Sequence, residues 1–167
     1  MNETENYLNE GDGSEVMGLG GMNFDVDSEF KPEPLAPNGS YRGAVTSVSF
    51  DSEKFCIVWG VVLQDNGGFA SDGETPVDGM KLFYRNWLPK PGDDTEYSKN
   101  GRTTKRQSKI NMMKKFADGM KIDIGTPQKI AEAIQYQTWV GLEVVCDVQV
   151  SEYKGEVRNE INKMVAA

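Results

Sequence analysis

The 167-residue sequence contains no histidine and only two cysteines, Cys56 and Cys146. Without histidine there can be no Ser-His-Asp triad and no Cys-His pair, and most zinc sites are excluded. Both cysteines lie in apolar stretches typical of strands, so we expect buried thiols in a reducing compartment and no disulfide. There is no run of 18 apolar residues and no secretory-signal pattern, so we expect a cytoplasmic protein with no membrane contact.

Carboxylates gather in two places, around residues 72–78 and 93–96. A metal-dependent nuclease needs such acids to converge on Mg²⁺. Here the acids stand beside glycine and proline in predicted loops, where they usually form turns. The sequence also lacks a phosphate-binding loop, a dinucleotide-binding turn and a Cys-x-x-Cys motif. We therefore expect no enzyme, no metal site and no cofactor.

The net charge of −8 is concentrated at the N-terminus. Residues 1–36 hold nine acids and one base, leaving 17 charges of each sign for residues 37–167. We expect 1–36 to be an acidic flexible arm without a fold of its own. Its scattered apolar residues, among them Val16, Met17, Phe24 and Phe30, fit docking on a partner or a neighbouring subunit, and a solubilising tail fits equally well. A further hypothesis is that the acids compete with nucleic acid for basic residues.

Residues 80–89 alternate in the manner of a strand with two different faces. One face is apolar, and the other carries Lys81, Phe83, Arg85 and Trp87. Single-stranded nucleic acid needs cations for its phosphates and flat rings for its bases. This face is therefore our first candidate binding surface, although strand aromatics often serve packing alone.

A second basic segment follows directly. Residues 97–117 contain seven cations and no acid, in a chain that has more acids than bases overall. Such a segment creates a local positive field, although basic runs are often only solvated surface. The candidate contacts in this segment are Tyr97, Lys99, Arg102, Lys105, Arg106 and Lys109. Phe69, alone in the polar loop 65–79, is a weaker candidate.

The pattern along the chain predicts five strands with helices inserted. We expect strands at 40–50, 55–64, 80–89, 140–150 and 157–165, with a bulge after Val45 and Trp59 in the core. We expect a helix from about 104 to 118 that ends at Asp118-Gly119, and a second from Thr126. This order is that of an OB-fold, a five-stranded barrel with its helix between strands three and four. An unrelated mixed fold has the same pattern.

Residues 37–165 resemble phage-encoded OB-fold single-stranded DNA-binding proteins of replication modules. The resemblance rests on the proline-rich lead-in to residues 39–43 (GSYRG) and on residues 148–161 (VQVSEYKGEVRNEI). It implies sequence-independent protection of single strands in phage replication or recombination, in the host cytoplasm. Bacterial-type members carry their acidic partner-recruiting tail at the C-terminus, whereas the acids here are N-terminal.

Two functions are therefore weighed. The first is a single-stranded DNA-binding domain at 37–167, whose arm contacts replication or recombination proteins. The second is a protein-interaction module, an inhibitor or adaptor, that works through the arm. RNA is an alternative ligand to DNA, because stacking platforms serve both. The sequence is also compatible with a homo-oligomer.

Overall fold

The computed structural model describes residues 18–167. The chain divides into two units, with a boundary between Glu33 and Pro34, three residues before the predicted start of the domain. In the N-terminal unit, the described residues form one short helix, α2 (Val26–Glu29), where the sequence predicted none. Asp25 caps it by accepting hydrogen bonds from two backbone N–H groups of the first turn. Val16 and Met17 lie outside the described residues.

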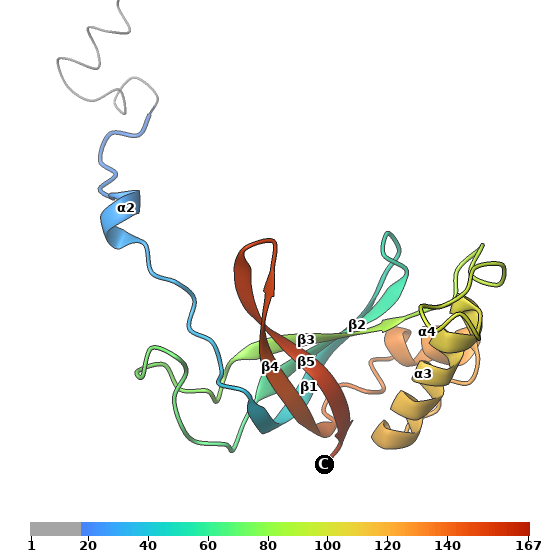
Figure 1. Ribbon diagram of the computed structural model, residues 1–167. Coiled ribbons are helices and arrows are strands. Elements are labelled where there is room, and N and C mark those ends of the chain that lie inside the picture. The colour runs from blue at the N-terminus through green and yellow to red at the C-terminus, as the bar shows by residue number, and fades with distance from the viewer. Residues whose placement is uncertain (1–17) are drawn as a thin grey trace, which may run out of the picture. The chain divides into compact units, whose positions relative to one another are not determined.

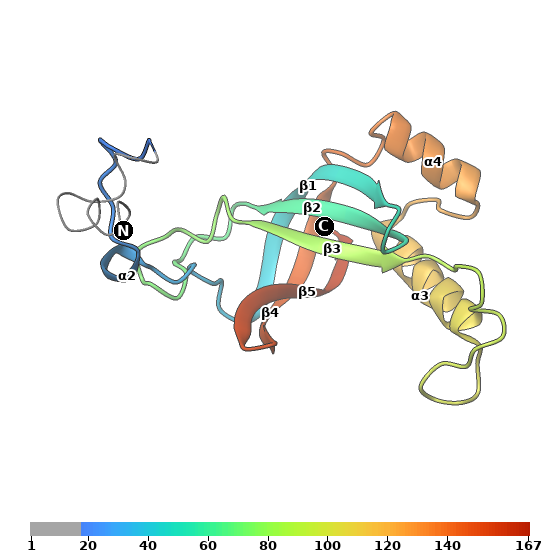
Figure 2. The same cartoon turned by 90° about the horizontal axis from the view of Figure 1, so that it is seen from above.

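The second unit is built on a five-stranded antiparallel sheet (Figures 1 and 2). The strand order is β3-β2-β1-β4-β5. Within residues 18–167 no ladder joins the edge strands β3 and β5, so the sheet is open. The strands are β1 (Gly39–Asp51), β2 (Cys56–Leu63), β3 (Lys81–Trp87), β4 (Glu143–Tyr153) and β5 (Glu156–Ala166). The predicted mainly β fold with a helical insertion is confirmed.

The helices α3 (Lys105–Met120) and α4 (Pro127–Gln135) lie between β3 and β4 in the sequence. Their N-termini were predicted correctly, and a threonine caps each helix: Thr104 accepts from the N–H of Gln107, and Thr126 from the N–H of Lys129. The predicted end of the first helix was wrong. The helix continues through Gly119 and ends at Met120, and Lys121 takes the left-handed conformation.

Gly119 has a packing role that explains this difference. A Cβ added there would lie 3.1 Å from Cγ1 of Val165 on β5, so glycine lets the helix approach the strand closely. The Asp118-Gly119 pair is typical of a helix end, but here the contact with the sheet fixes the residue type.

The central strand β1 is shared between two pairings. Its first half pairs with β4 and its second half with β2. The register shifts between Val45 and Ser47, which confirms the predicted bulge. A bulge bends the strand, so β1 can serve both neighbours.

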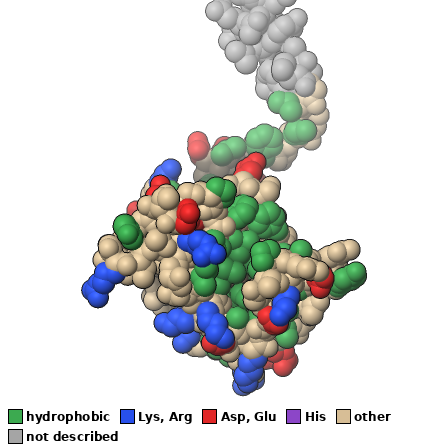
Figure 3. Space-filling view, turned by 90° about the vertical axis from the view of Figure 1, so that its right-hand side faces the viewer, with side chains coloured by type: hydrophobic (Ala, Val, Ile, Leu, Met, Phe, Trp, Pro, Cys, Tyr) green, Lys and Arg blue, Asp and Glu red, His purple; other side chains and the backbone are tan. Residues whose placement is uncertain are grey.

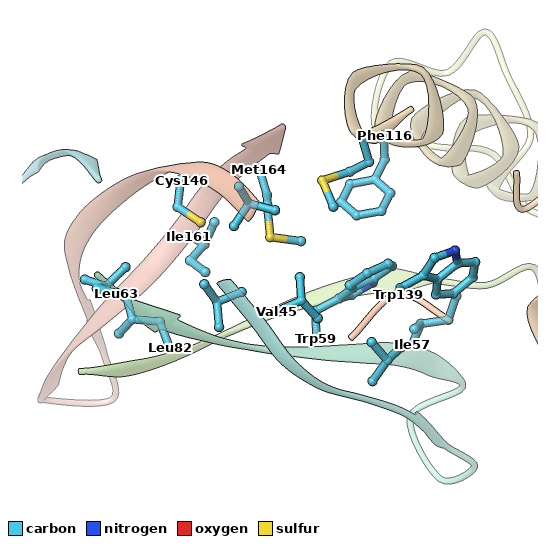
Figure 4. Close-up of a cluster of buried hydrophobic side chains, with 14 of the residues drawn as sticks. Val45, Ile57, Trp59, Leu63, Leu82, Phe116, Trp139, Cys146, Ile161 and Met164 are labelled. Atoms are coloured by element: carbon cyan, nitrogen blue, oxygen red, sulfur yellow. The ribbon is translucent and has the colours of Figure 1, made fainter. Parts of the chain in front are cut away.

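An aromatic cluster fills the core beside α3 (Figure 4). The Trp59 ring stacks on Trp139 at 5.1 Å and contacts Phe116 at 5.2 Å, and Phe116 in turn stacks on Tyr84. Trp59 is fully buried and donates its indole N–H to Oδ1 of Asn86 at 2.6 Å. The predicted core role of Trp59 is confirmed. Both cysteines are buried free thiols, also as predicted.

Three valines within the predicted strands 140–150 and 157–165 are exposed. Val140 precedes β4, while Val150 and Val157 lie where the β4–β5 hairpin extends past the core. The alternation itself is correct in the middle of the hairpin, where Val148 and Ile161 are buried. Alternation shows which residues share a face, but it does not show where the opposing layer ends.

Candidate nucleic-acid interface

The outer face of β3 carries all four side chains predicted for it. Lys81, Arg85 and both aromatic residues are exposed, with Phe83 at 48% and Trp87 at 45%. The alternate residues Leu82 and Asn86 are buried, at 7% and 5%. The predicted two-faced strand is therefore confirmed, and both rings present about half of their surface to solvent.

The neighbouring strand β2 contributes no side chain to this face at Gly60. Phe83 lies opposite Gly60 of β2 in the ladder. A Cβ at Gly60 would lie 2.3 Å from Oγ of Ser47 and 3.1 Å from Cε of Lys81, so these side chains lie where a side chain of residue 60 would be. The ammonium group of Lys81 lies 5.5 Å from the centre of the Phe83 ring. The cation and the ring therefore lie side by side where β2 contributes no side chain, an arrangement suited to a stacked base and its phosphate.

Two hairpins stand on the same side of β3 (Figure 1). The β1–β2 tip carries Phe50, 44% exposed, in edge contact with Phe55. The β4–β5 tip carries Tyr153, 55% exposed, with Nζ of Lys154 at 5.3 Å and the guanidinium of Arg158 at 5.1 Å from its ring. Tyr153, Lys154 and Arg158 were not among the contacts predicted from the sequence.

The basic segment begins in an ordered loop after β3. Tyr97 and Thr104 form an isolated antiparallel β-bridge, and the N–H of Ser98 donates to the carbonyl of Thr103 at 2.8 Å. Tyr97 is 64% exposed, and Lys99 and Arg102 are exposed beside it. The predicted Tyr97 ring and the cations Lys99 and Arg102 are therefore exposed to solvent on this loop.

A buried carboxylate fastens this loop to α3. Asp93 is 2% exposed. Its Oδ2 accepts from Nζ of Lys109 at 2.6 Å and from the N–H of Lys90 at 3.0 Å. The hydrogen bond from Lys109, with that from Lys90, lowers the pKa of Asp93. Asp93 is thus an anchor of the loop, as expected for a turn-forming acid.

Ion pairs divide the predicted cations into two groups. Lys109 is held by Asp93, and Lys105 by Glu96 at 2.6 Å. The other predicted cations have no ion pair within the described part of the chain and are exposed: Lys81, Arg85, Lys99, Arg102 and Arg106. These five are the ones whose charge is available to a phosphate.

The long loop between β2 and β3 is held by Asp78. Its carboxylate accepts from the N–H groups of Gly67 and Asn66, and these bonds lower the pKa of Asp78. Phe69 on this loop is 58% exposed, and its backbone forms an isolated antiparallel β-bridge with Pro76. Over residues 18–167, no three His, Cys, Asp or Glu side chains cluster closely enough to hold a metal ion.

No protein-family model and no curated protein matches this sequence. Across the described residues, none of the helices has the length and apolar character needed to cross a membrane.

The face that carries the helices shows apolar side chains at its centre with Lys and Arg around them (Figure 3).

Proposed function

We propose that this protein binds single-stranded DNA without sequence preference, across the outer face of β3. The observation that carries this proposal is the interleaving on β3 of two half-exposed rings, Phe83 and Trp87, with two cations that form no ion pair within residues 18–167, Lys81 and Arg85. Rings stack on any base and cations meet any phosphate, so such a surface binds single strands with little regard to sequence.

We further propose that the domain is an OB-fold. The strand order β3-β2-β1-β4-β5 is the order of an OB-fold barrel cut between its third and fifth strands. The bent β1, which pairs with both β2 and β4, and the helices between β3 and β4 support this assignment. In an OB-fold, the hairpins β1–β2 and β4–β5 flank the ligand, which agrees with aromatic residues at both tips.

The biological setting we infer is phage replication or recombination, in the host cytoplasm. The resemblance of residues 37–165 to phage single-stranded DNA-binding proteins supports it. In this role the protein covers single strands and does no chemistry on them, and residues 1–36 contact other replication or recombination proteins.

The test is the removal of each ring. Phe83→Ala and Trp87→Ala should each weaken binding to a fluorescent oligo-dT by about 5- to 150-fold, because a stacked base contributes about 1–3 kcal/mol. Tyr136, which is 73% exposed beyond α4, provides the matched control, and Tyr136→Ala should bind as the unmodified protein does. Equal affinity of all three variants would contradict the proposal.

A second function, a protein-interaction module, is favoured by a separate observation. The described part of the arm exposes Phe24, Val26 and Phe30, at 65%, 69% and 71%. Three large apolar side chains exposed within seven residues concentrate apolar surface in one segment, which is typical of a segment that binds a partner. Deleting residues 1–30 separates the two functions, since DNA binding through β3 should survive it. Competition of the bound oligo-dT with RNA of the same length measures the preference between them.

A further inference from the structure

A cleft of about 520 Å³ lies between β3, α3 and β5. Its apolar lining includes Trp87 of β3, and Met112, which is 62% exposed, together with Met113, Phe116 and Met164. Two of the cleft walls are the edge strands of the sheet, which have no ladder partner on their outer side within residues 18–167. Methionine-rich surfaces adapt to the side chains that dock on them.

Basic side chains border the same cleft. Arg85, Lys115 and Lys163 line it, and none of the three has an ion pair among the described residues. The register of β4 and β5 shifts between Asp147 and Val148, and as a result both Asn162 and Lys163 are exposed at the cleft. An apolar floor with a basic border fits a peptide that combines large apolar side chains with acids.

This sequence contains such a peptide. Residues 24–30 read Phe-Asp-Val-Asp-Ser-Glu-Phe, so in extended form the apolar residues share one face and the three acids share the other. Seven residues match the length of β3, which also has seven. The four-residue helix α2 that they form is short, and a helix of one turn has little stability of its own.

We propose that residues 24–30 of a second copy bind in this cleft as an extended segment. Phe24, Val26 and Phe30 then cover the methionine-lined floor, and the acids face the basic border. The backbone of the segment supplies hydrogen-bonding partners to a free strand edge, as in other cases of strand addition. Reciprocal exchange between two copies gives a closed dimer.

The test is sedimentation velocity on the full chain without DNA, over a wide range of protein concentration. The unmodified protein should self-associate. Phe24→Ser with Phe30→Ser should weaken association by at least about tenfold, and so should Lys115→Glu with Lys163→Glu. The matched control is Lys54→Glu with Lys121→Glu, the same charge change at exposed lysines that do not line the cleft.

Rescue experiments test whether the arm segment 24–30 and the cleft bind each other directly. Adding Asp25→Lys and Asp27→Lys to the Lys115→Glu, Lys163→Glu variant should restore association. Association should also return in part when the arm variant and the cleft variant are mixed, because the intact arm of one copy then meets the intact cleft of the other, while the reverse contact stays broken. A monomer at every concentration would overturn the proposal, as would a cleft variant that associates normally or fails to be rescued. None of these substitutions replaces a predicted DNA contact, but Arg85 and Trp87 also line the cleft, so oligo-dT binding is measured separately for each variant.

Discussion

The division of the predicted cations into paired and unpaired groups leads to a quantitative prediction about salt dependence. Arg102 and Arg106 form no ion pair with any residue that the structure describes, whereas Lys105 is bound to Glu96 at 2.6 Å. A single-strand contact changes the log-log salt slope by about 0.7 for each phosphate neutralised. Arg102→Gln with Arg106→Gln should therefore reduce the slope by about 1.4. At about 0.1 M salt this corresponds to about 25-fold weaker binding.

The control removes a charge pair and leaves the net charge unchanged. Lys105→Gln with Glu96→Gln should leave the slope as it is, because the ammonium group already has a carboxylate as its counterion. If all five unpaired cations contact phosphate, the slope of the unmodified protein is about −3.5. The assay is fluorescence anisotropy with labelled oligo-dT across a series of salt concentrations. An equal loss of slope in both double variants would refute the reasoning, since pairing would then not matter.

Two further predictions concern the fold that carries the interface. Gly43→Ala places a Cβ 2.7 Å from Cγ1 of Val61, so urea unfolding should show a loss of about 1–3 kcal/mol, whereas Gly39→Ala makes only ordinary contacts with Tyr41 and should be nearly neutral. Asp93→Asn removes a carboxylate whose pKa the hydrogen bond from Lys109 lowers below the ordinary range of an aspartate. The ionised carboxylate stabilises the fold above the pH at which an unfolded aspartate titrates, and this effect is lost as the pH falls through the lowered pKa. The melting temperatures of the variant and the unmodified protein should therefore differ at neutral pH and converge in strong acid.

The elements of the fold could be predicted because their signals are local. Alternation located β3 and its two faces, the Thr126 cap located the start of α4, and the apolar run 55–64 located the interior strand β2 that carries Trp59. Each of these depends on neighbouring residues, and side-chain direction alternates along any strand.

What the sequence could not show depends on contacts between distant residues. Lys109 is indistinguishable from the other lysines of its segment until its pairing with Asp93, 16 residues earlier, is seen. Gly119 has the sequence signature of a helix end, but the approach of Val165 decides its role. The cleft between β3, α3 and β5 also joins residues far apart in the chain, so no local pattern indicates it.

The most direct test of DNA binding across β3 uses the tryptophans themselves. Of the three, Trp59 and Trp139 are buried at 0% and 4% exposure, and only Trp87 can meet a base. Adding oligo-dT should quench the intrinsic fluorescence of the unmodified protein. Trp87→Phe, which keeps a ring for stacking, should still bind by anisotropy but lose the quenching. No binding at low salt, or quenching that persists in Trp87→Phe, would contradict the account.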